Sequence, residues 1–470
     1  MAKGNPVVVM LRDKHHGGNI AAPVYRASFT KAFLSSLYAI AISNVVIFDL
    51  DTPAFIVGVA SALNALAYFC GPLVFHGASR HAGIKQSLQL AGVVDLLAII
   101  LVLTIPSPAI LVMTFIVDGL ASCMFWANMS AAVRGYQDRA HPGIHERIYR
   151  RYNTSWIAGG LAGELLGLVI TVTGFDDRAG LGACVFIGIA QVFTSNRVDM
   201  PARAGDREAR DRRVSNAAAM PARNHVRPSI VRTIARALAG PIGLMIVAEL
   251  AIQMIRGTFD FLYPFILHDD GGSAGWVYLM SLAQRLALLL GIFTSSKQSI
   301  KGQLASAMLG LGMVLVLAVQ VVHVPGHAMF TAALLLSAFA SGLIYGFSSQ
   351  VLLRCGARGK ALQLASVYEA TSGLGYAIMV IIAGIGGDGD VRPVFAGLAA
   401  FLAVAIIMFV MVSRGEWIIR QWHHAKPFLP DFANPGRQPS TTLLRLVEAR
   451  ISTPHGRAID LPPLMDTAKK

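Results

Sequence analysis

Residues 196–239 read NRVDMPARAGDREARDRRVSNAAAMPARNHVRPSIVRTIARALA and divide the 470-residue chain into two similar parts. This stretch is rich in Arg, Ala, Asp and Pro and holds few large apolar residues, so we expect a basic linker. Six long apolar segments lie on each side of it. A helical run of about 20 apolar residues can cross a bilayer. The sequence therefore predicts an all-α membrane protein, in which 12 transmembrane helices form two pseudo-symmetric six-helix bundles.

The apolar segments set the expected boundaries. We expect helices at residues 29–48, 54–75, 87–105, 109–133, 154–173, 180–195, 240–266, 274–295, 303–322, 328–353, 361–385 and 393–412. The expected parts of the chain are a cytoplasmic tail at 1–28, a first bundle at 29–195, the linker at 196–239, a second bundle at 240–412 and a mostly flexible cytoplasmic tail at 413–470.

Basic residues occupy alternate gaps between the apolar segments. Arg26 and Lys31 extend the basic N-terminal tail, Arg150 lies in the fourth gap, and the linker holds ten Arg. The other gaps are acidic, as at Asp176 and Asp177. Short loops rich in Lys and Arg stay in the cytoplasm. We therefore expect both termini to be cytoplasmic and the protein to be a multi-pass protein of the plasma membrane.

Composition excludes several other classes of protein. Hydrophobic residues make up 54% of the chain and charged residues 14%, whereas a soluble domain carries about 25% charged residues. The net charge of +14 is spread over loops, which favours anionic lipid headgroups over nucleic acid as a partner. The four Cys form no CxxC pair and the His do not cluster, so we expect no metal. Because no phosphate loop or nucleophile constellation is visible, we expect no cofactor and no enzyme activity. We also expect the protein to be a monomer.

The gap after the second segment carries a recognisable motif. It reads SRHAGIK from Ser79, with Arg80, Gly83 and Lys85 at the places of a basic, glycine-containing turn. The gap after the eighth segment is a similar short basic turn, which suggests a repeat of the first half in the second.

The fifth segment carries a second motif. In RYNTSWIAGGLAGELLG, Gly159, Gly163 and Gly167 recur every four residues. Together with the six-plus-six pattern, these motifs resemble the major facilitator superfamily of secondary transporters over about residues 30–412. Glu164 stands where the antiporter motif of that family has Pro, and the turn lacks the acidic residue of the family signature. The resemblance implies alternating access, with the glycines and the basic turn in helix packing or gating.

The seventh segment contains the longest polar stripe. Glu249, Gln253, Arg256 and Asp260 are spaced at i, i+4, i+7 and i+11, which places all four on one helix face. One interpretation is a path for protons, through Glu249 and Asp260, and for substrate, bound by Gln253 and Arg256. The other is an ion-pair network that locks this helix to its neighbours.

Two further charges lie in the middle of predicted helices. Glu164 lies between glycines. A carboxyl there can carry a proton from one side of the membrane to the other, or it can be a packing residue paired with an Arg. Arg285 needs an anionic partner, which we expect to be Asp260, Glu249 or Glu369, or else an anionic substrate.

The fourth segment offers a second candidate pocket. Asp118 is a proton-coupling candidate, and Trp126 and Asn128 are substrate-binding candidates two to three turns further on. A carboxyl with an aromatic ring can hold an organic cation or a sugar. The alternative is a helix-packing Asp and an interfacial Trp. We expect Asp95 in the third segment to be a packing residue.

The remaining candidates are single polar residues. Glu369 precedes Gly373 and Gly375, a pattern that suits proton coupling and gating in a kinked helix but also a packing contact. Asn44 and Asn64 are expected to hold helices together first and to bind substrate second.

The sequence thus predicts a secondary transporter that moves a small organic solute, coupled to protons and with a slight preference for export. The alternative is a non-transporting membrane receptor or scaffold on the same fold.

Overall fold

The structure, a computed structural model, describes residues 21–105, 107–139, 144–198, 241–324, 326–355, 361–387 and 390–414. The predicted linker beyond Val198 and both predicted tails, apart from a few residues at their inner ends, lie outside the described residues.

The described residues fold into helices joined by short turns. The first helix, α2 (Ala22–Asn44), continues as the π-helix η1 (Val45–Asp49). The others are α3 (Ala54–Ala82), α4 (Ile84–Thr104), α5 (Pro108–Arg139), α6 (His145–Val172), α7 (Asp177–Asn196), α10 (Pro241–Asp269), α11 (Ala274–Ser296), α12 (Ile300–His323), α13 (His327–Cys355), α14 (Ala361–Gly387) and α15 (Arg392–Arg414). Twelve spans are long and apolar enough to cross a membrane, which confirms the prediction of an all-α membrane protein.

Several helices begin earlier or end later than predicted. The helix α2 starts seven residues before residue 29, and α6 starts at His145, so Arg26 and Arg150 lie within helices. The apolar runs stop at the first charged residue, whereas a helix can continue and extend its long basic side chains toward water. The predicted basic turn is a single-residue break at Gly83, whose φ of 85° suits glycine. Arg80 lies in α3 and Lys85 in the first turn of α4.

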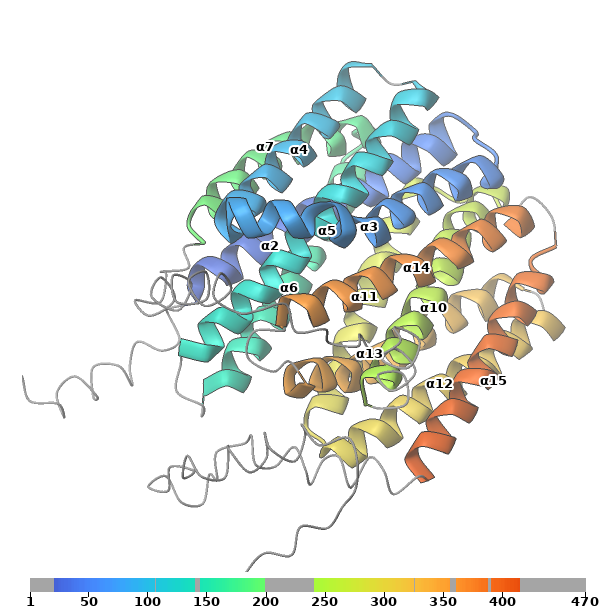
Figure 1. Cartoon of the computed structure of the whole chain (residues 1–470). Helices are drawn as coiled ribbons and strands as arrows, with labels where there is room; N and C mark the ends of the chain where they lie inside the picture. Colours follow the sequence, from blue (N-terminus) through green and yellow to red (C-terminus); the bar gives the residue numbers. More distant parts are fainter. Residues whose placement is uncertain are drawn as a thin grey trace, which may run out of the picture. The chain divides into compact units, whose positions relative to one another are not determined.

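The helix pairing of the first half is repeated in the second. In the first half α2 packs on α6 and α7, α3 on α5, and α4 on α5 and α7. In the second half α10 packs on α14 and α15, α11 on α13, and α12 on α13 and α15. The two halves meet where α3 lies beside α14 and where α6 lies beside α11 (Figure 1). In the internal repeat α3 corresponds to α11 and α14 to α6, so the two contacts between the halves are equivalent. The predicted pseudo-symmetric bundles are confirmed.

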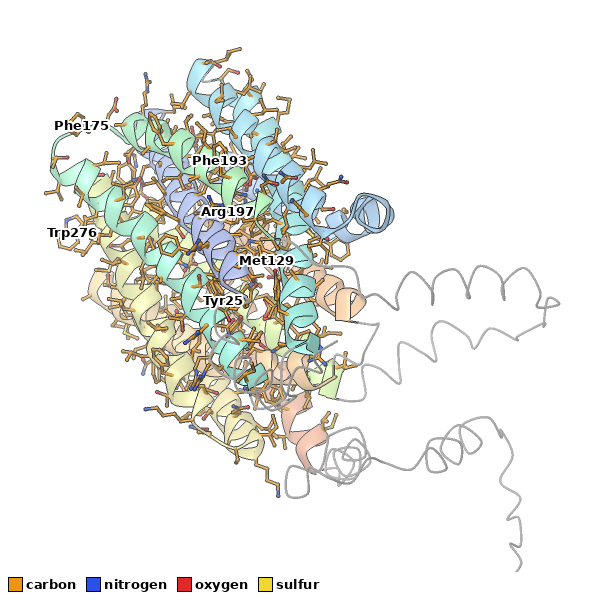
Figure 2. The ribbon with its side chains drawn as sticks, turned by 90° about the vertical axis from the view of Figure 1, so that its left-hand side faces the viewer. Tyr25, Met129, Phe175, Phe193, Arg197 and Trp276 are labelled. Carbon is orange, nitrogen blue, oxygen red and sulfur yellow. The ribbon has the colours of Figure 1, made fainter. Side chains whose placement is uncertain are left out.

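The outer surface of the helices is apolar. Phe175, Phe193 and Trp276 project outward from the ribbon (Figure 2), and the side chain of Phe193 is 68% exposed. Exposed large apolar residues of this kind are expected where lipid tails replace water around a membrane protein.

The two ends of the helices differ in charge. The basic end is where α2 begins, and Arg147, Arg150 and Lys297 lie there. The acidic end is where η1 finishes, and it carries Asp176 and Asp269. The expected assignment of the basic end to the cytoplasm rests on this charge difference.

Candidate functional site

An ion pair joins the two halves at the crossing of α6 and α11. Arg285 Nε and Nη2 both lie 2.7 Å from Glu164 Oε1. Nη2 also donates to Ser36 Oγ of α2 at 2.8 Å. The side chain of Glu164 is 3% exposed and that of Arg285 is 18% exposed. Glu164 is therefore the partner of Arg285, in place of the three carboxyls considered from the sequence.

Glycines of α6 make this crossing possible. A Cβ on Gly160 would fall on the guanidinium of Arg285, so only glycine leaves room for the ion pair. Gly167 lies against the ring of Tyr278 in α11. Gly159 and Gly163 face α2, where an added Cβ would collide with the backbone carbonyl of Phe29 or of Phe33. The glycine motif thus lies at helix contacts on both sides of α6.

The second crossing also brings a carboxyl to a polar partner. Tyr68 of α3 donates a hydrogen bond to Glu369 of α14. Gly373 lies against the backbone of Ala65 and Phe69 one turn further along α14, which lets the two helices approach. The structure therefore places Glu369 at the contact between the halves, opposite a residue that the sequence analysis did not single out.

The polar stripe of α10 divides into two pairs. Gln253 donates to Glu249 at 2.8 Å, and Glu249 is buried. Arg256 Nε lies 3.2 Å from Asp260, which also accepts from Gln284 of α11 at 2.8 Å. The side chain of Arg256 is 50% exposed. The stripe thus contains the ion pair of the locking interpretation, while half of the Arg256 side chain remains exposed, as the path interpretation requires.

A buried charge cluster lies inside the first half. Lys31 Nζ of α2 is 2.7 Å from Asp95 of α4 and 3.9 Å from Asp118 of α5. Gln191 of α7 donates to Asp95 at 3.1 Å, and Asn64 of α3 donates to Asp118 at 3.1 Å. The side chains of Lys31 and Asp95 are 1% and 2% exposed. Lys31 is therefore an interior residue and does not belong to the tail, and Asp95 is its ion-pair partner.

Trp126 and Asn128 lie apart from this cluster. Trp126 packs edge-to-face on Phe125 and against a buried apolar cluster that includes Met129. Asn128 donates back to the carbonyl of Met124 at 2.7 Å within its own helix. The structure gives these two residues packing surroundings, while Asp118 faces Lys31.

Polar contacts also join the halves at the acidic end. Asp177 of α7 accepts from Asn44 of α2 at 3.3 Å and from Tyr278 of α11 at 3.1 Å. Asn44 also donates to the carbonyl of Ala274 at 3.4 Å. Asn44 is thus a bridge between helices. Asp177 was counted with the acidic loops, but it begins a helix and is buried.

An aromatic contact joins the halves near the basic end. The rings of Trp156 in α6 and Tyr345 in α13 meet edge-to-face, with centroids 6.0 Å apart. Both side chains donate to Asn153 Oδ1, Trp156 at 3.3 Å and Tyr345 at 3.5 Å. The halves are therefore in contact near both ends as well as at the ion pair of α6 and α11.

Across the described ranges, no group of three His, Cys, Asp or Glu side chains is arranged to hold a metal ion.

Comparisons with known proteins define the fold. No family model matches the sequence, and a comparison with curated proteins gave no match. The structure is similar to that of a D-xylose-proton symporter, with a TM-score of 0.60 and 12% identity, covering 83% of this chain and 96% of that one. It is also similar to the human organic anion transporter MFSD10 (TM-score 0.58, 14% identity, 83% and 98% covered) and to the nucleoside transporter NupG (0.57, 13%, 84% and 99%). The chain shares the fold of these transporters, which confirms the fold that the resemblance implies.

Proposed function

We propose that this protein is a secondary transporter that moves a small organic solute across the plasma membrane by alternating access. In this mechanism the two halves rock about a site near the middle of the bilayer. The observation that carries the proposal is the ion pair between Arg285 and Glu164. It joins α6 of the first half to α11 of the second, and Ser36 of α2 accepts a further hydrogen bond from Arg285.

The chemistry of this pair supports a moving interface. A charge inside the bilayer is costly and is found mainly where it faces a partner or a water-filled path. Asp260 and Arg256 lie within electrostatic range of Glu164. Arg285 can therefore exchange one carboxylate for another as the halves move, without entering the low-dielectric interior unpaired. The half-exposed side chain of Arg256 and the amide of Gln253 are the groups proposed to meet the solute.

Proton coupling is the proposed source of energy. Glu164 and Glu369 lie at contacts between the halves, Glu249 and Asp260 lie on α10 of the second half, and Asp118 lies within the first half. Carboxyls of this kind can take up a proton on one side and release it on the other. We propose export as the direction, on the basis of the glycine motif of α6 alone.

The test uses liposomes that contain the purified full chain and a pH-sensitive dye. Pools of sugars, amino acids, organic acids and cationic drugs are added outside in turn. We expect one pool to move protons in the wild type. Glu164→Gln keeps the size of the side chain but breaks the ion pair, so the signal should disappear while the protein stays folded and monomeric.

A matched control separates coupling from a general loss of charge. Asp390→Asn removes a carboxylate at an exposed pair with Arg392, where 63% of the Asp390 side chain is accessible, and it should leave the signal unchanged. A wild-type signal in Glu164→Gln would make Glu164 a packing residue. Absence of solute movement for every pool, also measured with labelled solutes, would favour the receptor or scaffold alternative.

A further inference from the structure

The polar face of α10 carries one charged side chain that its neighbours leave partly uncovered. Arg256 lies at the middle of this 29-residue helix, and 50% of its side chain is exposed. The helix is otherwise well enclosed, because 72% of its apolar stretch is buried, a larger share than in any other described span. A charge in the middle of a membrane-spanning helix faces a partner or a water-filled path and rarely faces lipid. The exposed part of Arg256 is therefore expected to face the inside of the protein.

Two other faces of α10 are covered by helices of the second half. Phe259 packs on Phe330 of α13 and on Phe395 of α15. On another side of the helix, Gly257 lies against the backbone of Tyr376 in α14. The helical spacing places Arg256 between these two covered faces.

Asp260 connects the face of Arg256 to the contact between the halves. Gln284 of α11 donates to Asp260 at 2.8 Å. The next residue of α11 is Arg285, which forms the ion pair with Glu164 of α6. Because Arg256 and Asp260 lie four residues apart on one helix face, the exposed part of Arg256 lies on the side of α10 that faces the first half.

The hydrogen bonds at this place occupy the acceptors and leave donors unused. Arg256 Nε donates to Asp260 Oδ2 at 3.2 Å, while Asp260 Oδ1 accepts from Gln284. Both oxygens of the carboxylate are thus engaged. A guanidinium has five N–H donors, but the described residues accept a hydrogen bond from Nε alone. The unused capacity is that of a donor, which fits a ligand with acceptor oxygens.

We propose that the transported solute is a small organic anion whose carboxylate binds the terminal nitrogens of Arg256. The planar guanidinium matches a carboxylate with two parallel hydrogen bonds. Asp260, 3.2 Å from Nε, repels a second negative charge, which favours a monocarboxylate over a dicarboxylate or a phosphate. A cationic solute would instead have to compete with both Arg256 and Gln284 for Asp260.

This inference names the substrate class and rests on the proposed function for transport, but binding can be measured without transport. A ligand that binds only the folded state raises the unfolding temperature of the purified full chain in detergent. The probes are carboxylates matched with their neutral amides: lactate and lactamide, benzoate and benzamide, and nicotinate and nicotinamide. We expect at least one carboxylate to stabilise the wild type, and its amide to have no effect.

Three variants assign the effect to Arg256. Arg256→Gln should abolish the stabilisation by the carboxylate. The matched control Arg392→Gln should keep it, because Arg392 is similarly exposed, at 55%, and also lies beside an Asp, but at the acidic end. Asp260→Asn removes the competing carboxylate and should tighten binding about tenfold, the lower end of the coupling between close charge pairs. A purely structural ion pair would give no such tightening.

Several outcomes would overturn the proposal. It is wrong if no carboxylate stabilises the wild type, if Arg256→Gln keeps the stabilisation, or if Asp260→Asn weakens binding, as a site for a cation would require. If Arg256→Gln does not fold, the double variant Arg256→Gln/Asp260→Asn removes the whole ion pair and should also fail to bind the carboxylate. Carboxylate binding without solute movement in the liposome assay would support this site and contradict the proposed transport.

Discussion

Replacing Lys31 with Met leaves the buried carboxylate of Asp95 and the partly buried carboxylate of Asp118 without their cation. Lys31 lies 2.7 Å from Asp95 and 3.9 Å from Asp118, and its side chain is 1% exposed. Removing one partner of a buried ion pair costs about 3–5 kcal/mol, because the remaining charge stays desolvated. We expect a loss of this size in the free energy of unfolding, since Met preserves the length and apolar volume of the side chain.

The opposite change should cost less. In Asp95→Asn the ammonium keeps Asp118 at 3.9 Å, where the attraction between unit charges is about 4 kcal/mol at an effective dielectric of 20. The amide of Gln191 loses its charged acceptor, which costs about 1.5–3 kcal/mol. The two single variants should therefore differ, with Lys31→Met clearly the less stable of the two.

The assay is thermal and denaturant unfolding of the purified chain in detergent, followed by tryptophan fluorescence. The double variant Lys31→Met/Asp95→Asn should be no less stable than Lys31→Met alone, because one of the two repelling carboxylates has been removed. The reasoning is refuted if Lys31→Met is as stable as the wild type, or if Asp95→Asn is the more damaging change.

Gly160→Ala should push the guanidinium of Arg285 off Glu164, destabilising the fold by about 1–3 kcal/mol and stopping transport in the liposome assay. Gly182→Ala, whose added Cβ meets nothing, should change neither quantity, and an equal effect of the two would contradict the packing argument. Tyr278→Phe removes a donor from the buried carboxylate of Asp177 and should cost about 1.5–3 kcal/mol in unfolding experiments. Tyr345→Phe loses a 3.5 Å bond to a neutral amide and should cost less, so the reverse order would count against the contacts assigned at the two ends.

The periodic features of the chain were predictable from the sequence. Twelve apolar runs, the division into halves and the glycine spacing of α6 each follow from local composition, which the bilayer restricts strongly. The residues at which the helices begin and end were less predictable. Lys31 was counted with the basic residues of the tail, although it falls within the predicted segment 29–48 and a buried carboxylate compensates its charge.

The partners across helices could not be predicted from one sequence. The spacing of the stripe on α10 shows that Arg256 can reach Asp260, because both lie on one helix. It cannot show that Arg285 points to Glu164, since that depends on how α6 and α11 are rotated toward each other. Tyr68 and Asp177 were missed for the same reason. A tyrosine in an apolar run and an acid in a turn look ordinary until another helix is placed beside them.

The most direct measurement follows both ends of the two halves at once. Spin labels replace Arg178 and Arg392 at the acidic end, or Arg150 and Lys297 at the basic end, in a chain whose four Cys have been removed. Distance distributions are then compared between Glu164→Gln and the wild type in nanodiscs. If the halves rock about the mid-membrane ion pair, breaking it should lengthen the distance at one end and shorten it at the other. Distances that stay unchanged, or that change in the same direction at both ends, would contradict alternating access about this pair.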